Sequence, residues 1–359
     1  MSTAFLKSGP FLHGKASTST SMALVLIALI PTTGYGIFLF GRPALLLCAV
    51  TMVSALIFEA LCVAAMRRPV LPCLMDGSAL LTGVLLVLSL PPWAPWWIGV
   101  LGSALAIVVA KQIFGGLGQN VFNPAMMARV ALLISFPLDM TTFVKPLGLT
   151  DPGAPGWLDS LRITFMPQPA FFDAVSSASV LGHIRTETGR GVSVADALSS
   201  LPDLNAMFFG HTAGSLGETS AALILLGGLF LLATRVIRWH IPLAMIATIA
   251  AFAATFHAID PKVYSSATVH VLSGATMMGA FFIATDPVTS PSSTRGRIVF
   301  AIGCGALTYI IRTWGGFPEG IAFAVLLMNA LTPLIDRYLR PRIHGRTRKG
   351  AAITVEKRA

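Results

Sequence analysis

The stretch LLTGVLLVLSLPP at residues 80–92 has a counterpart in MMGAFFIATDPVTSP at residues 277–291. A Gly-Gly pair follows each stretch, at residues 115–116 and 315–316. Because about five apolar spans separate equivalent points, the second unit is expected to enter a membrane in the opposite direction to the first. The repeat therefore predicts two inverted five-helix units.

The composition outside these stretches also indicates a membrane protein. The 359 residues are 55% hydrophobic and only 11% charged, which leaves too few polar side chains to cover the surface of a soluble globule. A span needs about 20 mainly apolar residues, so we expect an all-α integral membrane protein of about ten transmembrane helices. The expected spans are residues 23–40, 44–65, 78–90, 96–110, 124–136, 219–233, 241–256, 269–285, 298–311 and 321–334.

The distribution of charge predicts how the chain is oriented. A net charge of +10 does not indicate a nucleic-acid partner here, because the charges lie between apolar spans rather than on one basic face. Lys and Arg concentrate in the C-terminal tail and in loops on one side, so both termini are predicted to be cytoplasmic in a bacterial inner membrane.

The chain divides at one long polar segment, residues 139–217, which has seven acidic and four basic residues and is predicted to be periplasmic. The predicted divisions are a cytoplasmic N-terminal segment (1–22), a first repeat (23–138), the periplasmic loop (139–217), a second repeat (218–336) and a basic cytoplasmic tail (337–359).

Two glycine-rich segments predict broken helices. GGLGQNVFNPAMMARV (115–130) and GGFPEG (315–320) place glycines, proline and amides where continuous helix would otherwise be expected. Unwound backbone is tolerated in a membrane where protein or a cavity satisfies it, so these segments are expected to direct helix N-termini toward a central site. The alternative interpretation is close packing of the glycines against neighbouring helices.

Ionisable residues at the span ends are candidates for an ion pathway, because charge within a membrane is expensive. Glu218, Asp286 and Glu319 are the candidates, with helix capping as the alternative role. Arg129 is expected to pair with a carboxylate or to contact a cofactor. The four cysteines lack CxxC spacing, so no metal site is expected, and no catalytic side chain is assigned.

Several long motifs resemble one known family. They are DGSALLTG, PPWAPWW, KQIFGGLGQNVFNPAM, LLISFP, IRWHIPL, HVLSGATMMGAFFIATDPVTS and GGFPEGIAFAVLLMNALTPLID. In this order and spacing they resemble the D-type subunit of the Rnf electron-transport complex, which is related to the B-type subunit of the sodium-pumping NADH:quinone oxidoreductase. The resemblance implies a membrane subunit of a redox-driven, ion-translocating oxidoreductase.

The resemblance also implies an FMN joined through its phosphate to a hydroxyl in the outer loop. The family motif has Asp, two residues, Ser or Thr, one residue, Ala, then Thr. Here Asp173, Ser176 and Ala178 match, and Ser179 stands where Thr is usual. A serine hydroxyl forms the same phosphoester, so Ser179 is the expected attachment residue. Ser273 and Thr276 spell part of the motif but lie in an apolar span, where they are expected to pack helices or line a cavity.

Further cofactors and partners follow from the same resemblance. A second, non-covalent flavin such as riboflavin is expected among the helices, with candidate contacts at Gly115, Gly116, Asn120, Asn123 and Arg129. The expected partners are other Rnf-type subunits, including a second flavin-tethered subunit and iron-sulfur subunits, together with a flavin transferase and membrane lipid. Two alternatives remain open: a channel or secondary transporter of inverted-repeat fold, and a membrane scaffold whose loop has lost its cofactor.

Overall fold

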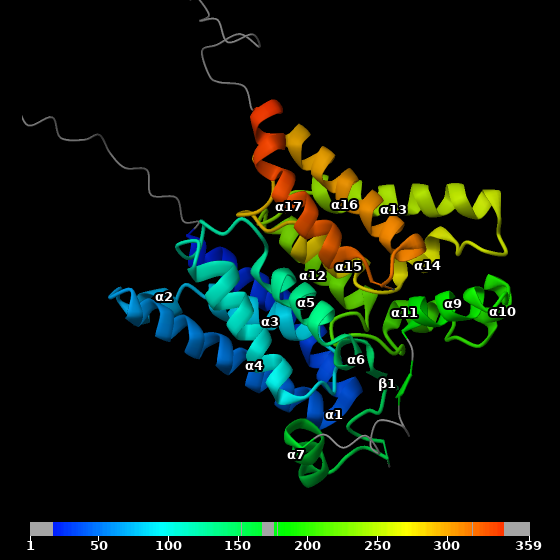
Figure 1. The fold of residues 1–359 in the computed structure, drawn as a ribbon, viewed down its shortest axis with the longest axis horizontal. Helices are drawn as coiled ribbons and strands as arrows, with labels where there is room; N and C mark the ends of the chain where they lie inside the picture. The colour runs from blue at the N-terminus through cyan, green and yellow to red at the C-terminus, as the bar shows by residue number, and fades with distance from the viewer. Residues whose placement is uncertain (1–16, 152, 167–175, 178, 318, 341–359) are drawn as a thin grey trace, which may run out of the picture.

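Long apolar helices form the body of the protein (Figure 1). The structure is a computed structural model, and it describes residues 17–151, 153–166, 176–177, 179–317 and 319–340. The elements of the first part are α1 (Thr18–Ala65), α2 (Val70–Leu74), α3 (Ser78–Leu88), α4 (Trp96–Ala104), the π-helix η1 (Leu105–Gln112) and α5 (Pro124–Ser135). Those of the last part are α12 (Ala221–Ala233), α13 (His240–Ile259), α14 (Ala267–Leu272), α15 (Thr276–Met278), the π-helix η2 (Gly279–Ile283), α16 (Thr294–Trp314) and α17 (Ile321–Tyr338).

These helices confirm the predicted all-α membrane fold. Among the described residues, four helices are long and apolar enough to cross a membrane, namely α1, α13, α16 and α17. The shorter apolar helices are α3, α4 with η1, α5 and α12. The inverted relation of two five-helix units stays a prediction.

The first helix contains a break that hydropathy places between two spans. α1 runs through both of the first two predicted spans, but Gly41 has φ 78° and ψ −161°, a conformation that glycine adopts without a Cβ clash. Arg42 follows the break, donates a hydrogen bond to the Pro155 carbonyl at 2.8 Å, and lies 5.5 Å from the centre of the Trp157 ring. The break is therefore fixed against the middle segment of the chain.

A second break was not predicted from the sequence, where residues 269–285 were expected to form one span. The structure ends α14 at Leu272 and begins α15 at Thr276, with Ser273 extended and Gly274 at φ +65°. Backbone groups at the facing ends of these two short helices form hydrogen bonds with Arg312 and Glu319, described below. The helix can be interrupted here because side chains of distant residues form hydrogen bonds with backbone groups that have no helical partner.

The middle segment folds into short elements at one end of the bundle, where α6, β1 and α7 lie near α1 (Figure 1). These elements are α6 (Pro137–Thr141), β1 (Phe143–Val144), α7 (Trp157–Phe165), β2 (Ser176–Ser177), α9 (Val180–Gly189), α10 (Val194–Ser199) and α11 (Leu204–Phe209). β1 and β2 form one antiparallel pair, with Phe143 opposite Ser177 and Val144 opposite Ser176.

The end of the middle segment enters the helical core. The backbone N–H groups of Leu216 and Gly217 donate to the carbonyls of Leu90 and Leu88, at 3.1 and 2.6 Å. A Cβ on Gly217 would lie 2.8 Å from the Leu88 Cβ, so only glycine permits this approach. The contact places the next residue, Glu218, inside the protein rather than at a membrane surface.

Candidate functional site

A buried ion pair joins α1 to η1. The Lys111 ammonium lies 2.8 Å from Glu59 Oε1 and donates a second hydrogen bond to the Ser78 hydroxyl, also at 2.8 Å. Asp76 accepts hydrogen bonds from the backbone N–H and the hydroxyl of Ser78. The Lys111 and Glu59 side chains are 2% and 3% exposed. An unpaired charge at such a depth is very costly, so each residue depends on its partner.

A second buried cation occupies a comparable position in the other half of the chain. Arg312 precedes the second Gly-Gly pair as Lys111 precedes the first, and it donates to the Thr276 hydroxyl at 2.8 Å. Ser78 and Thr276 each lie just after a glycine of positive φ, Gly77 at +79° and Gly274 at +65°. The two halves therefore share a cation bonded to a hydroxyl at the start of a short helix, as the sequence repeat suggests.

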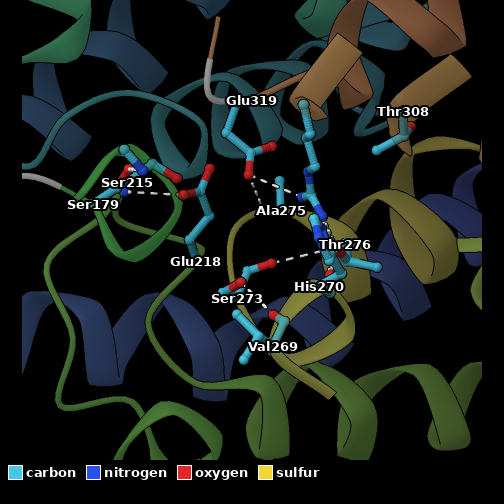
Figure 2. Close-up of polar contacts among 12 residues, drawn as sticks. Ser179, Ser215, Glu218, Val269, His270, Ser273, Ala275, Thr276, Thr308 and Glu319 are labelled. Carbon is cyan, nitrogen blue, oxygen red and sulfur yellow. Dashed lines mark hydrogen bonds and ion pairs between the residues drawn. The ribbon is translucent and has the colours of Figure 1, made fainter. Parts of the chain in front are cut away.

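Arg312 also forms hydrogen bonds with the end of α14, at the break before α15, and with Glu319 (Figure 2). It donates to the His270 carbonyl at 2.9 Å and to Glu319 Oε1 at 2.9 Å. The same carboxylate oxygen accepts the Ala275 N–H at 3.3 Å. Thus the carboxylate caps the N-terminal side of α15, while the guanidinium serves the C-terminal side of α14. The Arg312 side chain is 1% exposed.

Arg129 on α5 pairs with Glu218. Pairing with a carboxylate was one of the two roles expected for Arg129 from the sequence. Its guanidinium lies 3.5 Å from Glu218 Oε1 and also donates to the Ser89 carbonyl at 2.5 Å. Glu218 Oε2 accepts a long hydrogen bond of 3.5 Å from the Ser215 N–H. Glu218 does not cap α12, because the Ser220 hydroxyl takes that role by accepting from Leu223 N–H.

Ser179 lies beside the carboxylate residues Glu218 and Glu319. It immediately precedes α9, and its hydroxyl oxygen accepts the Gly182 N–H at 3.2 Å, which makes it the N-cap. A small cavity is lined by Ser179, Glu218, Ser273 and Glu319. Figure 2 shows Glu218 on the side toward Ser179 and Ser215, with Glu319 nearer to Ala275. Of the other motif residues, Ser176 lies in β2, whereas Asp173 and Ala178 lie outside the described residues.

A larger cavity of about 180 Å³ lies between the two halves. Its wall is mainly apolar, from helices α1, α3, α12 and η2, and its polar lining includes Lys111, Asn120, Asn123 and Asp286. Asn123 caps α5 by accepting the Met126 N–H at 3.2 Å, and its amide lies 3.4 Å from Asp286 Oδ2. Asn120 is buried, and its Oδ1 has no hydrogen-bond partner among the described residues.

The structure thus separates the predicted site residues into two groups. Asn120, Asn123 and Asp286 line the larger cavity, whereas Ser179, Glu218 and Glu319 surround the small one. Arg129 belongs with the second group through Glu218, so it does not lie with the two asparagines, contrary to the set of flavin contacts expected from the sequence.

One small cavity is lined by first-turn residues of both helices that follow the glycine-rich segments, Met126 of α5 and Ile321 of α17. Arg129 and Glu319 line the same small cavity, whereas Pro124, the first residue of α5, borders the larger cavity. Gly115 and Gly116 do not line either; their φ values of +115° and +99° form the turn that leads to Asn120.

The comparisons with known proteins agree with this architecture. A family model described as "NQR2, RnfD, RnfE family" matches residues 5–345. The chain belongs to this family. A relative from Stutzerimonas stutzeri is 56% identical over 343 residues, covering 96% of both chains, and one from Halorhodospira halophila is 51% identical over 352 residues, covering 98% of both. A relative from Escherichia coli (strain SE11) is 42% identical over 355 residues, covering 96% of this chain and 99% of its own.

Each of these relatives is described as the D-type subunit of an ion-translocating oxidoreductase complex. Membership of the NQR2, RnfD, RnfE family therefore makes this chain a membrane subunit of a multi-subunit redox enzyme that translocates ions. A stand-alone channel or transporter, the alternative left open by the inverted repeat, is disfavoured by this membership.

Sequence reasoning missed three polar residues of this family member. Lys111, Arg312 and His270 were not among the site residues predicted from the sequence, yet Lys111 and Arg312 form buried ion pairs and His270 is 7% exposed. The signal that would have found the two cations is their shared place just before a Gly-Gly pair, four residues ahead in one case and three in the other. Glu319, the partner of Arg312, was already a candidate from the sequence.

Proposed function

We propose that this protein is the flavin-carrying D-type subunit of an Rnf-type complex, in which Ser179 holds FMN through a phosphoester and the subunit relays electrons coupled to ion movement. The observation that carries the proposal is the position of Ser179, at the start of a ten-residue helix. The backbone N–H groups of a first helical turn and the helix dipole favour a phosphate there. No acidic residue lies in the first turn of α9 to oppose it.

The surroundings of Ser179 fit such an attachment. The Ser179 hydroxyl already accepts a backbone N–H, and a phosphoester oxygen would take the same bond. Ser179 is 8% exposed, so a transferase has to reach it before the loop packs fully. The flavin supplies reversible electron transfer when bound. The first turn of α9 would hold the phosphate end.

The direct experiment uses four versions of the chain, each produced with the flavin transferase. The wild type and Ser179→Thr are expected to show flavin fluorescence on a denaturing gel, whereas Ser179→Ala and Ser179→Asp are expected to show none. Aspartate is a good N-cap, so Ser179→Asp separates loss of attachment from loss of the helix start. A fluorescent band in Ser179→Asp would contradict the assignment of Ser179.

We also propose that the larger cavity holds the non-covalent flavin. Its mainly apolar wall suits a ring system, and the partnerless Asn120 Oδ1 supplies a buried acceptor for a ring N–H. Asn123 and Asp286 lie at the same cavity and provide further polar contacts. This proposal needs Asn120 and Asn123 but not Arg129.

The test for the second flavin measures acid-extractable flavin per purified chain. Asn120→Leu is expected to lower that amount severalfold, because it removes the acceptor and fills polar space with an apolar side chain. The matched control is Asn205→Leu, at an exposed asparagine of α11. Equal flavin content in both variants would place the second flavin elsewhere.

The topology completes the proposal. Both termini are cytoplasmic and the segment holding α7 and α9 to α11 faces the periplasm, as the concentration of Lys and Arg suggests. Glu218 and Glu319 then lie toward the periplasmic side of the ion pathway, and Asp286 toward the cytoplasmic side. Labelling of single cysteines placed at exposed Arg162 and Arg238 tests this orientation.

The partners are the other Rnf-type subunits, including a second flavin-tethered subunit and iron-sulfur subunits.

A further inference from the structure

A cavity of about 230 Å³ lies along α9, next to the small cavity at Ser179. Leu181 borders both cavities, so they share one wall. The α9 residues that line the 230 Å³ cavity are spaced at helical intervals and therefore form one face: Leu181, Ile184, Arg185 and Thr188. The opposite wall comes from the segment before α14 and from the end of α16.

The chemistry of this cavity is that of a site for a flat, polar aromatic ring. Tyr264 and Trp314 contribute aromatic side chains with ring centres 6.3 Å apart. Arg185 and Arg312 also line the cavity; Arg185 donates to the carbonyls of Gly315 and Phe317, whereas Arg312 Nε is buried without a partner among the described residues. Aromatic walls bind rings by stacking, and guanidinium groups favour electron-rich atoms.

Two buried nitrogen atoms at this cavity have no hydrogen-bond partner among the described residues. They are His270 Nδ1 and Arg312 Nε. His270 is 7% exposed and Arg312 is 5% exposed, and both residues line the cavity. Buried polar atoms in proteins are almost always satisfied, so two orphans at one cavity indicate a ligand with acceptor atoms.

We propose that this cavity holds the isoalloxazine ring of the flavin tethered at Ser179, with His270 and Arg312 directed at ring acceptor atoms. The proposal rests on the proposed attachment of FMN. Ile184 and Arg185 lie five and six residues after Ser179, about 8–9 Å along the axis of α9. An FMN attached at Ser179 would have to span this distance along the helix to place its ring in the cavity.

Blocking the cavity without touching the tether tests the proposal. Thr188 lines the cavity and its hydroxyl bonds only to backbone carbonyls of its own helix, so Thr188→Phe fills the space and leaves Ser179 unchanged. Thr186→Phe is the matched control, because Thr186 is exposed on the same helix. The full chain is produced with the transferase, and the iodide quenching constant of the covalent flavin fluorescence is measured.

The expected result is a quenching constant severalfold larger in Thr188→Phe than in the wild type and in Thr186→Phe, because the displaced ring meets solvent. Equal constants in all three, with the fluorescent gel band intact, overturn the cavity assignment and leave the attachment standing. A missing gel band in the wild type instead refutes the attachment itself. The two failures are therefore distinguishable.

A second variant covers the case in which Thr188→Phe does not fold. His270→Ala removes one donor that would stabilise the electron-rich reduced ring. The equilibrium is expected to shift about tenfold toward oxidised flavin, which lowers the two-electron midpoint potential by about 30 mV. His183→Ala is the control, since His183 on α9 bonds to Ser200 and does not line the cavity. An unchanged potential in His270→Ala contradicts the proposed ring contact.

Discussion

Glu319 packs directly against Gly274, so that a Cβ added to Gly274 would overlap the Glu319 carboxylate and lie 2.9 Å from Arg312 Nη2. This contact joins the break between α14 and α15 to the segment that precedes α17. The helix break and the Arg312–Glu319 ion pair therefore both depend on the absence of a side chain at Gly274.

Gly274→Ala is expected to destabilise the protein by more than about 2 kcal/mol, because it adds left-handed strain and displaces a buried ion pair. Gly316→Ala is the control, since nothing lies within 4 Å of its added Cβ. The measurement is the temperature at which the buried thiols of Cys48 and Cys304 begin to react with a fluorogenic maleimide. Equal onset temperatures for both variants would show that the contact is unimportant.

Lys111→Met is expected to cost about 3–5 kcal/mol, because it leaves the Glu59 carboxylate buried without a partner. The double variant Lys111→Met with Glu59→Gln is expected to recover most of that loss, since neither charge remains. The same thiol-reactivity temperature measures both. Additive losses in the double variant would contradict a direct coupling of the two residues.

An exposed ion pair provides the comparison for that experiment. Asp159 and Arg162 on α7 lie 4.0 Å apart, and both side chains are more than half exposed. Asp159→Asn is expected to change the unfolding temperature very little, corresponding to less than about 1 kcal/mol.

Glu218→Gln is expected to lower the number of ions moved per electron severalfold in proteoliposomes of the whole complex. The neutral amide keeps the side-chain size but removes the charge that faces Arg129 and the cavity beside Ser179. Glu187→Gln is the control, because Glu187 pairs with Arg190 at the end of α9, whose side chain is 69% exposed. An unchanged ratio of ions to electrons would remove Glu218 from the ion pathway.

The helical body was predicted well from the sequence, because each span is a local property of composition. Hydropathy located α3, α5, α12, α13, α16 and α17 within a few residues of their ends. It missed the interruption at Ser273–Ala275, since Arg312 and Glu319 stabilise that break from positions about 40 residues away. A window of hydropathy cannot register a partner at that distance.

The candidate sites were predicted less completely, for a related reason. Asn120, Asn123 and Asp286 were all named from the sequence, and the structure places them at one cavity. Lys111 was not predicted as a site residue, because its partner Glu59 lies 52 residues earlier on another helix. Only the packing of α1 against η1 shows that the two charges neutralise each other.

The mass of the proteolytic peptide that contains Ser179, taken from the protein produced with its flavin transferase, decides whether this chain carries a tethered flavin. We predict an added mass of one FMN less one water, with fragment ions that place the addition on Ser179. A peptide of unmodified mass, recovered while a known substrate of the same transferase is fully modified, would contradict the attachment and the electron relay that depends on it.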